Sequence, residues 1–190
     1  MIEIKVATED LVSDVGTLFG TDRAANGCWC MWFIIPVKDY HAGGREKNRR
    51  RFCELVQSCT EPVGLLAYLN DCPVGWCAVG PRARYIRAIR TPTFKERDAS
   101  EDGVVWLVPC FFVRADARHA GVSRALLERA VSLAEEHGAI AIEGFPYAGS
   151  KRRSGGDIQV GVEPVFASCG FSVLRRPSDS RVVMRRDLKR

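Results

Sequence analysis

The sequence predicts a mixed α/β fold, in which helices flank one central sheet that holds both parallel and antiparallel strands. Two observations carry this prediction. Segments with the alternating or continuous apolar pattern of strands are interleaved with segments whose apolar residues recur at helical spacing. The chain also has 190 residues, 46% of them hydrophobic, which is enough for one well-packed domain and too few for two comfortable ones. We therefore expect residues 1–190 to form a single domain.

The chain is expected to begin with a strand and a helix. Residues 2–7 alternate like a strand, and Thr8 is placed to cap a helix that begins at Glu9 and ends near Gly20. Residues 27–36 are too apolar for an ordinary loop. We expect this segment to pack against the core or to form the wall of a pocket.

A basic helix and a hairpin are expected next. The glycine pair at residues 43–44 precedes the helix, which turns Phe52 inward and its arginines outward. Residues 63–69 and 74–79 read as two strands joined at residues 70–71, an Asn-Asp turn that is typical of a hairpin.

The second half of the chain continues the alternation of strands and helices. Residues 91–103 are polar and are expected to form a mobile segment, and residues 147–160 read as a loop. The remaining expected elements are strands at 104–113, 139–142, 171–175 and 181–186, and helices at 122–138 and 161–169.

The most informative segment is the connection between the expected central strand and the helix that follows it. The apolar strand ends at Val113, and a short polar turn containing Gly121 leads directly into an amphipathic helix. The first amides of a helix have no intrahelical partner, and the helix dipole places partial positive charge there. With Arg118, His119 and Arg124 as further donors, the turn suits a phosphate or diphosphate; the alternative is an ordinary strand-to-helix connection.

The spacing of this turn is Arg118-x-x-Gly121-x-Ser123. It matches neither the G-x-G-x-x-G of dinucleotide-binding turns nor a Walker loop. It resembles the Arg/Gln-x-x-Gly-x-Gly/Ala signature of the GNAT acyltransferases, with Ser123 as a variant of the last small residue. Further segments resemble a bacterial branch of that family: residues 28–32, 73–76, 81–82, 106, 110–113, 143–146, 161–166 and 170–171.

The resemblance implies the GNAT acyl-CoA N-acyltransferase fold, with acetyl-CoA as cosubstrate. It implies transfer of an acetyl group to a primary amine of a small molecule or peptide, by direct attack in a ternary complex. It also implies a sheet that opens beside the central strand, so that the pantetheine arm can pair with strand backbone. The residues carried over are Phe111, Phe112 and Val113 for pantetheine, and Arg118, His119, Ala120, Gly121, Val122, Ser123 and Arg124 for the diphosphate.

The catalytic groups are less well defined by the sequence. Glu143 ends a buried strand beside the cofactor-bearing helix and is a candidate general base, but a structural carboxylate that pairs with an arginine explains it equally well. Phe166 stands where many relatives have a tyrosine that protonates the thiolate, and phenylalanine cannot donate a proton. Tyr147 and Cys169 are substitutes by proximity, with a loop anchor and a core filler as their alternatives. A catalytically weak, CoA-binding sensor is therefore the second hypothesis.

Two groups of residues are candidates for binding the acceptor. Trp29 and Trp32, with Met31 and Phe33, could form the wall of a pocket, and Arg82 could stand at its mouth together with arginines 84, 87 and 90. Such a pocket suits an acceptor with an apolar body and an acidic group. The alternatives are that the aromatic residues pack in the core and that the arginines lie on a solvated face.

Composition and charge exclude several other classes of protein. The net charge of +5 suits an anionic cofactor without demanding nucleic acid, and the clusters at residues 49–51 and 151–153 lack interleaved aromatic residues. No apolar run approaches the roughly 18 residues of a membrane span, and the N-terminus does not read as a signal peptide, so we expect a cytoplasmic protein without a membrane partner. The eight cysteines lack zinc-site spacing, so we expect reduced thiols and no metal. The identity of the acceptor and the choice between a monomer and a homodimer stay open.

Overall fold

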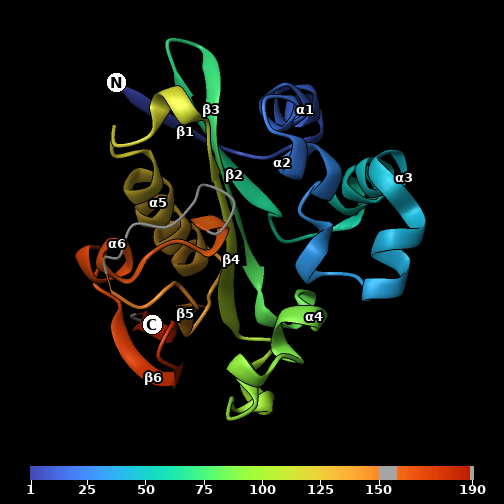
Figure 1. The fold of residues 1–190 in the computed structure, drawn as a ribbon. Helices are drawn as coiled ribbons and strands as arrows, with labels where there is room; N and C mark the ends of the chain where they lie inside the picture. The colour runs from blue at the N-terminus through green and yellow to red at the C-terminus, as the bar shows by residue number, and fades with distance from the viewer. Residues whose placement is uncertain (150–157, 189–190) are drawn as a thin grey trace.

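The computed structural model describes residues 1–149 and 158–188 and is organised around one seven-stranded mixed sheet (Figure 1). The strands lie in the order β1-β2-β3-β4-β5-β7-β6. The β4–β5 pair is parallel, and the other neighbouring strands are antiparallel. The strands are β1 Ile2–Val6, β2 Gly64–Leu69, β3 Cys72–Pro81, β4 Val105–Val113, β5 Ala141–Gly144, β6 Ser172–Ser178 and β7 Arg181–Asp187.

Helices cover both faces of this sheet. Helices α1 to α4 lie on one face, and α5 and α6 lie on the other (Figure 1). The helices are α1 Val12–Gly20, α2 Arg23–Cys28, α3 Val37–Ser58, α4 Ile86–Ile89, α5 Val122–Glu136 and α6 Glu163–Ser168. Short 3-10 turns lie at Glu9–Leu11, Met31–Phe33, Arg82–Arg84, Pro92–Phe94, Ala99–Glu101, Ala115–Ala117 and Ile158–Val160.

The elements expected from periodicity are present. All seven strands occur where the apolar pattern predicts them, and β4 lies at the centre of the sheet. The turn between β2 and β3 places Asn70 and Asp71 at φ angles of 50° and 61°, as a tight hairpin turn requires. On α5, the amphipathic pattern is confirmed, since its buried residues include Val122, Leu126, Ala130, Leu133 and Ala134.

Two expectations about helix starts are wrong. Thr8 makes no side-chain capping hydrogen bond, because the segment after it first forms the 3-10 turn Glu9–Leu11 and becomes α-helical at Val12. The basic helix begins at Val37, ahead of the glycine pair, and Gly44 is a kink within it, with a φ of 60°. Because a left-handed residue interrupts the helical path, α3 changes direction there.

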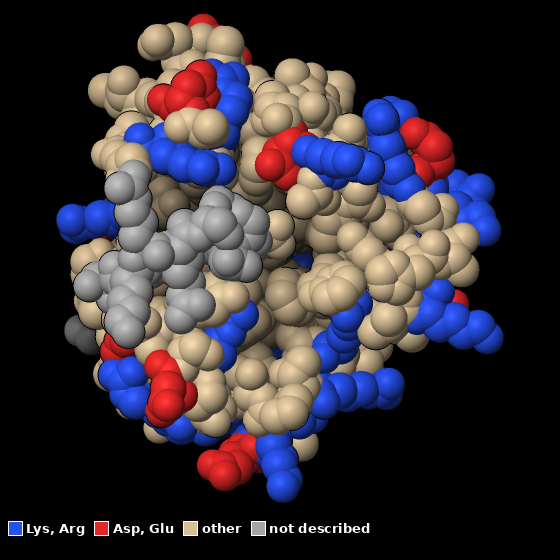
Figure 2. Space-filling view, viewed as in Figure 1, with Lys and Arg blue, Asp and Glu red and all other residues tan. Residues whose placement is uncertain are grey.

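The basic face of α3 contains acidic partners. Arg50 pairs with Glu54 one helical turn away, and Arg45 pairs with Glu46. In Figure 2, Lys and Arg side chains gather over α3 at the right, with Asp and Glu among them. This mixture is typical of a solvated helix face. The other basic cluster, at residues 151–153, lies outside the described residues.

Residues 91–103 were expected to be a mobile polar segment, and the structure shows two 3-10 turns instead. Phe94 is fully buried there, in contact with Phe145 at a centroid distance of 5.3 Å. Arg97 and Asp102 form an ion pair of 3.0 Å. The polar composition of this segment did not predict its order, because the order depends on charged side chains that bind one another.

None of the helices in the described parts of the chain combines the length and the apolarity needed to cross a membrane.

Candidate functional site

The central strand has an edge that is paired along only part of its length. Residues 105–108 of β4 pair with residues 141–144 of β5, and beyond Val108 no described strand continues on that side. Residues 110–113 remain paired with β3 on the other side. The outer backbone groups of this half-strand have no described strand partner, which suits pairing with an extended ligand.

Pro109 marks the point where β4 separates from β5. The β3–β4 register shifts between Ala78 and Gly80, opposite this part of β4, which is the sign of a bulge. Trp106 and Val108 pack in the cluster beneath α5, whereas Cys110 and Phe112 pack in the cluster beneath α1–α3. Even-numbered residues of β4 thus face α5 before the bulge and face α1–α3 after it. Proline has no amide to donate, so it is suited to this interruption in the ladder.

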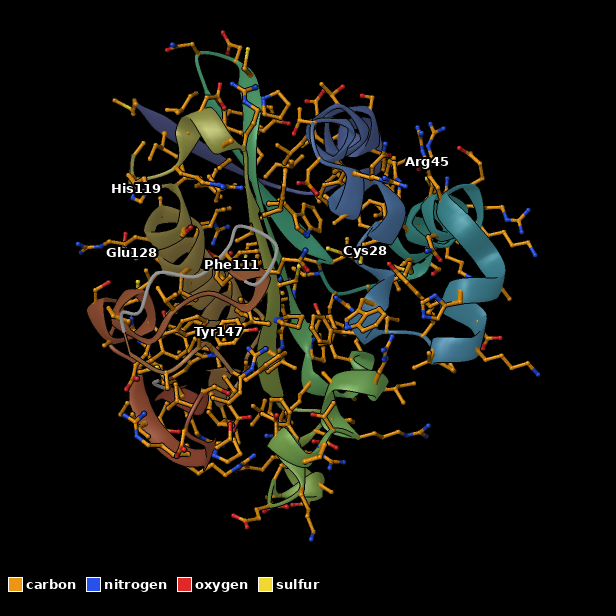
Figure 3. The ribbon with its side chains drawn as sticks, viewed as in Figure 1. Cys28, Arg45, Phe111, His119, Glu128 and Tyr147 are labelled. Atoms are coloured by element: carbon orange, nitrogen blue, oxygen red, sulfur yellow. The ribbon has the colours of Figure 1, made fainter. Side chains whose placement is uncertain are left out.

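The turn after β4 presents the amino end of α5 to solvent. Gly121 precedes α5 with a φ of 82°, and no side chain caps the helix. His119, at a φ of 65°, is also left-handed. The first α-helical bond in this region runs from the Ala125 amide to the Gly121 carbonyl, which leaves the amides of residues 122–124 without helical partners. The exposed turn can therefore bind an anion, and Figure 3 shows His119 on it.

The side chains around this turn add positive charge. The Arg118 side chain is held at the end of β4, where its Nε donates to the Val113 carbonyl at 3.3 Å. Arg124 lies in the first turn of the helix and forms an exposed ion pair of 2.8 Å with Glu128. The diphosphate-binding residues predicted from the sequence thus lie together at the carboxyl end of the half-open strand.

Gly75 brings the amino end of α5 close to the sheet. A Cβ added to Gly75 of β3 would lie 2.6 Å from Cγ1 of Val122, closer than real side chains approach each other. The first residue of α5 consequently packs directly on β3. This contact places the free amides of the helix beside the end of β4, where a ligand could contact both.

A narrow pocket adjoins the half-open strand on the α1–α2 face. Cys110, Phe111 and Phe112 of β4 contribute to it, and Gln159 approaches from the 3-10 turn Ile158–Val160. Its other lining residues are Phe19, Ala25, Cys28, Cys30 and Trp76. Figure 3 shows Cys28 on the α1–α2 side of the sheet, facing β4. The described lining contains no charged side chain, so the pocket suits an uncharged group.

Glu143 lies in a buried network of ion pairs. Its carboxylate accepts from Nη1 of Arg82 at 2.8 Å and from Nη1 of Arg185 at 3.3 Å, and its side chain is 1% exposed. Arg82 is equally buried and also binds Asp102 at 2.7 Å. Both carboxylate oxygens of Glu143 are thus held by arginines. This geometry favours the structural alternative for Glu143, and it removes Arg82 from the mouth of any acceptor pocket.

The aromatic segment divides between the core and the surface. Trp29 is 2% exposed and packs on Phe19 and Phe52, so it supports the pocket from behind. Trp32 is 36% exposed and carries the guanidinium of Arg87 over its ring, 3.3 Å from the centroid. Of the two predicted tryptophans, Trp32 is the one available to an acceptor.

The candidate acids lie on the α6 side of the strand. Tyr147 bridges to Val162 and Arg181, with the Arg181 guanidinium 3.8 Å from its ring centroid. Phe166 is fully buried, 5.0 Å from Phe171 and 6.0 Å from Phe111 between ring centroids. Cys169 is buried, and burial raises the pKa of its thiol. Both Phe166 and Cys169 therefore occupy core positions.

The sequence reasoning missed three contributors to the site. Pro109 could have been identified from the sequence, since proline within a strand indicates an edge or a bulge. The sequence predicts only that Cys28 and Cys110 are reduced thiols, whereas the structure shows that both line the pocket. No local pattern could have paired them, because they are distant in the sequence. Within residues 1–149 and 158–188, no three His, Cys, Asp or Glu side chains are arranged to hold a metal ion.

Comparisons with known proteins agree with this geometry. A sequence model described as the acetyltransferase (GNAT) family matches residues 29–147, more than half of the chain. No curated protein sequence matches significantly.

Solved structures are similar in fold over almost the whole chain. An N-acetyltransferase from Staphylococcus aureus Mu50 has 16% identity and a TM-score of 0.58, with 100% of this chain and 99% of that chain covered. The PaiA N-acetyltransferase from Thermoplasma acidophilum, in complex with coenzyme A, has 14% identity and a TM-score of 0.55, with 99% of both chains covered. The structure of yncA from Salmonella typhimurium with its cofactor acetyl-CoA has 15% identity and a TM-score of 0.57, with 99% and 94% covered. At these identities the likeness shows a shared fold.

Proposed function

The chain belongs to the acetyltransferase (GNAT) family, and from this we propose that it transfers the acetyl group of acetyl-CoA to a primary amine of a small molecule or peptide. The amine would attack the thioester directly within a ternary complex. The observation that carries the proposal is the junction of two features, the unpaired edge of β4 and the free amides at the start of α5. Two of the similar structures, of PaiA and of yncA, contain coenzyme A and acetyl-CoA.

The residues present suit two parts of this cofactor, the diphosphate and the pantetheine arm. The turn at residues 118–124 supplies amides and arginines for a diphosphate, and residues 111–113 supply strand backbone for the amides of the pantetheine arm. Cys110 and the bulge at Pro109 lie at the other end of this half-strand from the turn, and they would adjoin the residues that hold the arm. When bound, acetyl-CoA supplies an activated acyl group that an amine can take up.

The chain's own contribution to the reaction is mainly positioning. Holding an amine and a thioester in line removes most of the entropy cost of the reaction, so a protein nucleophile is not needed. Because Glu143 is bound by Arg82 and Arg185, we do not assign it as the base. We retain Tyr147 as the candidate acid, since it is half-buried beside the opening of the sheet.

One observation favours a second function, that of a CoA-binding sensor with weak turnover. Phe166 occupies the position of the usual tyrosine and is fully buried, so it offers no proton to a leaving thiolate. A sensor would bind acetyl-CoA and hydrolyse it only slowly to CoA, at a rate that does not depend on any amine.

The experiment that separates the two functions incubates the purified protein with acetyl-CoA and a panel of amines, and follows both products by mass spectrometry. A transferase yields acetylated amine and CoA in equal amounts, at a rate that depends on the amine. CoA release that no amine accelerates would support the sensor and contradict the transferase.

The Arg118→Glu variant is expected to weaken the binding of acetyl-CoA by roughly tenfold or more, since charge-assisted contacts contribute about 1.5–3 kcal/mol. Isothermal calorimetry at near-physiological ionic strength measures this change. Arg45→Glu is the matched control, because it makes the same charge change on the exposed side of α3. Equal effects of the two variants would show that only overall charge matters, and would contradict a specific diphosphate site.

The Trp32→Ala variant is expected to raise the KM for the amine acceptor, with little change in the affinity for acetyl-CoA. Trp32 is exposed, and the guanidinium of Arg87 lies over its ring. Loss of the apolar area that the indole offers to an acceptor would cost about 1–2 kcal/mol of binding energy. Steady-state kinetics against acceptor concentration measure the effect, and an unchanged KM would exclude Trp32 from the acceptor site.

A further inference from the structure

A cluster of aromatic and cationic side chains lies beside the opening of the sheet. Trp32 belongs to a 3-10 turn, and the ring of the next residue, Phe33, lies 5.4 Å from the ring of Phe145 between centroids. Phe145 directly follows Gly144, the last residue of β5 that pairs with β4. The turn that carries Trp32 therefore packs against the point where β4 and β5 separate.

Arg87 of α4 is fixed on Trp32 by two contacts. Its guanidinium carbon lies 3.3 Å from the centroid of the indole ring, and its Nη1 donates to the Trp32 carbonyl at 3.2 Å. Trp32 also packs edge-on against Tyr40 of α3, at a centroid distance of 5.0 Å. Residues from three separate elements thus hold the Arg87 guanidinium in one place.

The positive charge of Arg87 has no acidic partner in the part of the chain that the structure describes. Arg82, which the sequence placed at the mouth of an acceptor pocket, binds Glu143 and Asp102 instead. Only one donor of Arg87 is used in a described hydrogen bond. Burial lowers the pKa of the Arg87 guanidinium, which nevertheless stays charged at neutral pH. A half-buried cation with unused donors and no counter-ion is suited to bind an anion.

Exposed apolar side chains adjoin this cation. Ile86 directly precedes Arg87, Val37 begins α3, and both are exposed, as is part of Trp32. The 3-10 turn that carries Trp32 contacts both α3 and α4, so these side chains surround one turn. In Figure 2, Lys and Arg side chains border a hollow in the middle of the molecule, on the side where α4 lies. A ligand that has both an anionic group and an apolar body matches this surface.

We propose that Arg87 binds the carboxylate of the acetyl acceptor, and that this acceptor is an amino acid with an apolar or aromatic side chain. The proposal rests on the proposed function, because it names the acceptor class for the same site. A guanidinium fork can donate two parallel N–H bonds to a carboxylate, and the exposed parts of Trp32 and Ile86 would contact the apolar side chain.

The carboxylate takes no part in the transfer itself. The amine nitrogen forms a bond to the acetyl carbon, the C–S bond of acetyl-CoA breaks, and the proton lost by the amine ends on the CoA thiol. Arg87 is therefore a positioning residue, which holds the acceptor while its amine reacts.

The first test compares L-phenylalanine with L-phenylalaninamide, which keeps the amine and the ring but replaces the carboxylate with a neutral group. Mass spectrometry of the acetylated products gives kcat/KM for each acceptor. Arg87→Ala is expected to lower the ratio of the two values, acid over amide, by about tenfold or more, since a charge-assisted contact is lost. Arg45→Ala removes the same charge from the exposed side of α3 and should leave the ratio unchanged.

A second measurement does not require turnover. N-acetyl-L-phenylalanine keeps the carboxylate and the ring but has no free amine, and calorimetric titration of the protein loaded with CoA measures its affinity. Arg87→Ala is expected to weaken this binding by about tenfold, and Arg45→Ala to leave it unchanged. Circular dichroism shows whether each variant keeps its fold.

Several outcomes would overturn the proposal. An acid-to-amide ratio that is the same in the wild type and in Arg87→Ala would exclude a role of Arg87 in binding the carboxylate. Undetectable binding of N-acetyl-L-phenylalanine, or acetylation of other amines but of neither L-phenylalanine nor L-leucine, would exclude this acceptor class. Binding that depends on Arg87, in a protein that acetylates no amine, would support the carboxylate site and contradict the proposed transfer.

Discussion

The Arg82→Ala variant is expected to lose about 3–5 kcal/mol of folding free energy, because removal of one partner leaves the other charge buried and uncompensated. Arg82 and Glu143 are each 1% exposed, and Arg82 also binds Asp102 and the Asp98 carbonyl. Its loss would release the segment at residues 98–102 together with Glu143. Chemical denaturation followed by circular dichroism measures the change.

Arg129→Ala provides the matched control for this prediction. Arg129 and Glu136 form an ion pair of the same 2.8 Å length, but their side chains are 31% and 54% exposed. An exposed pair contributes about 0–1 kcal/mol. Equal losses in the two variants would show that burial of the Arg82 network does not matter.

The Glu143→Gln variant tests what the carboxylate does. If Glu143 is structural, this variant should lose stability and keep its activity per folded molecule. If Glu143 is also the general base, the rate per folded molecule should fall by about 10²–10⁴-fold in addition. The second result would overturn our structural assignment of Glu143.

The Gly121→Val variant is expected to abolish detectable binding of acetyl-CoA. Gly121 has a φ of 82°, and the left-handed region is strongly unfavourable for a β-branched residue. The turn would either strain or rearrange, and the amides at residues 122–124 would no longer point at one ligand. Calorimetric titration with acetyl-CoA measures the loss, and circular dichroism shows whether the fold remains.

The other end of α5 supplies a control with the same strain. Gly138 has a φ of 70°, and like Gly121 it has no atom within 4 Å of an added Cβ. Gly138→Val should therefore cost similar stability and leave acetyl-CoA binding unchanged. If both variants lost binding equally, general destabilisation would explain the effect, and the turn before α5 would not be the binding site.

Much of the fold could be predicted because its signals are local. The strand and helix periods, the Asn70-Asp71 turn and the buried face of α5 each depend on residues that are neighbours in the sequence. The order at residues 91–103 could not, because it depends on Phe94 reaching Phe145 and on Arg82 reaching Asp102. Polarity alone suggests a solvated loop, whereas paired charges can be ordered and partly buried.

By itself, the sequence determined the mixed α/β class and the glycine-containing turn before α5, since backbone conformation and apolar periodicity are set by adjacent residues. The tertiary structure alone decided which distant residues meet. It brought Arg82 to Glu143, and it placed Cys28, Cys30 and Cys110 around one pocket. It also showed that the even-numbered residues of β4 lie on one face of the sheet before Pro109 and on the other face after it. Contacts between residues far apart in the chain depend on how the sheet and its helices pack, and no short segment encodes that packing.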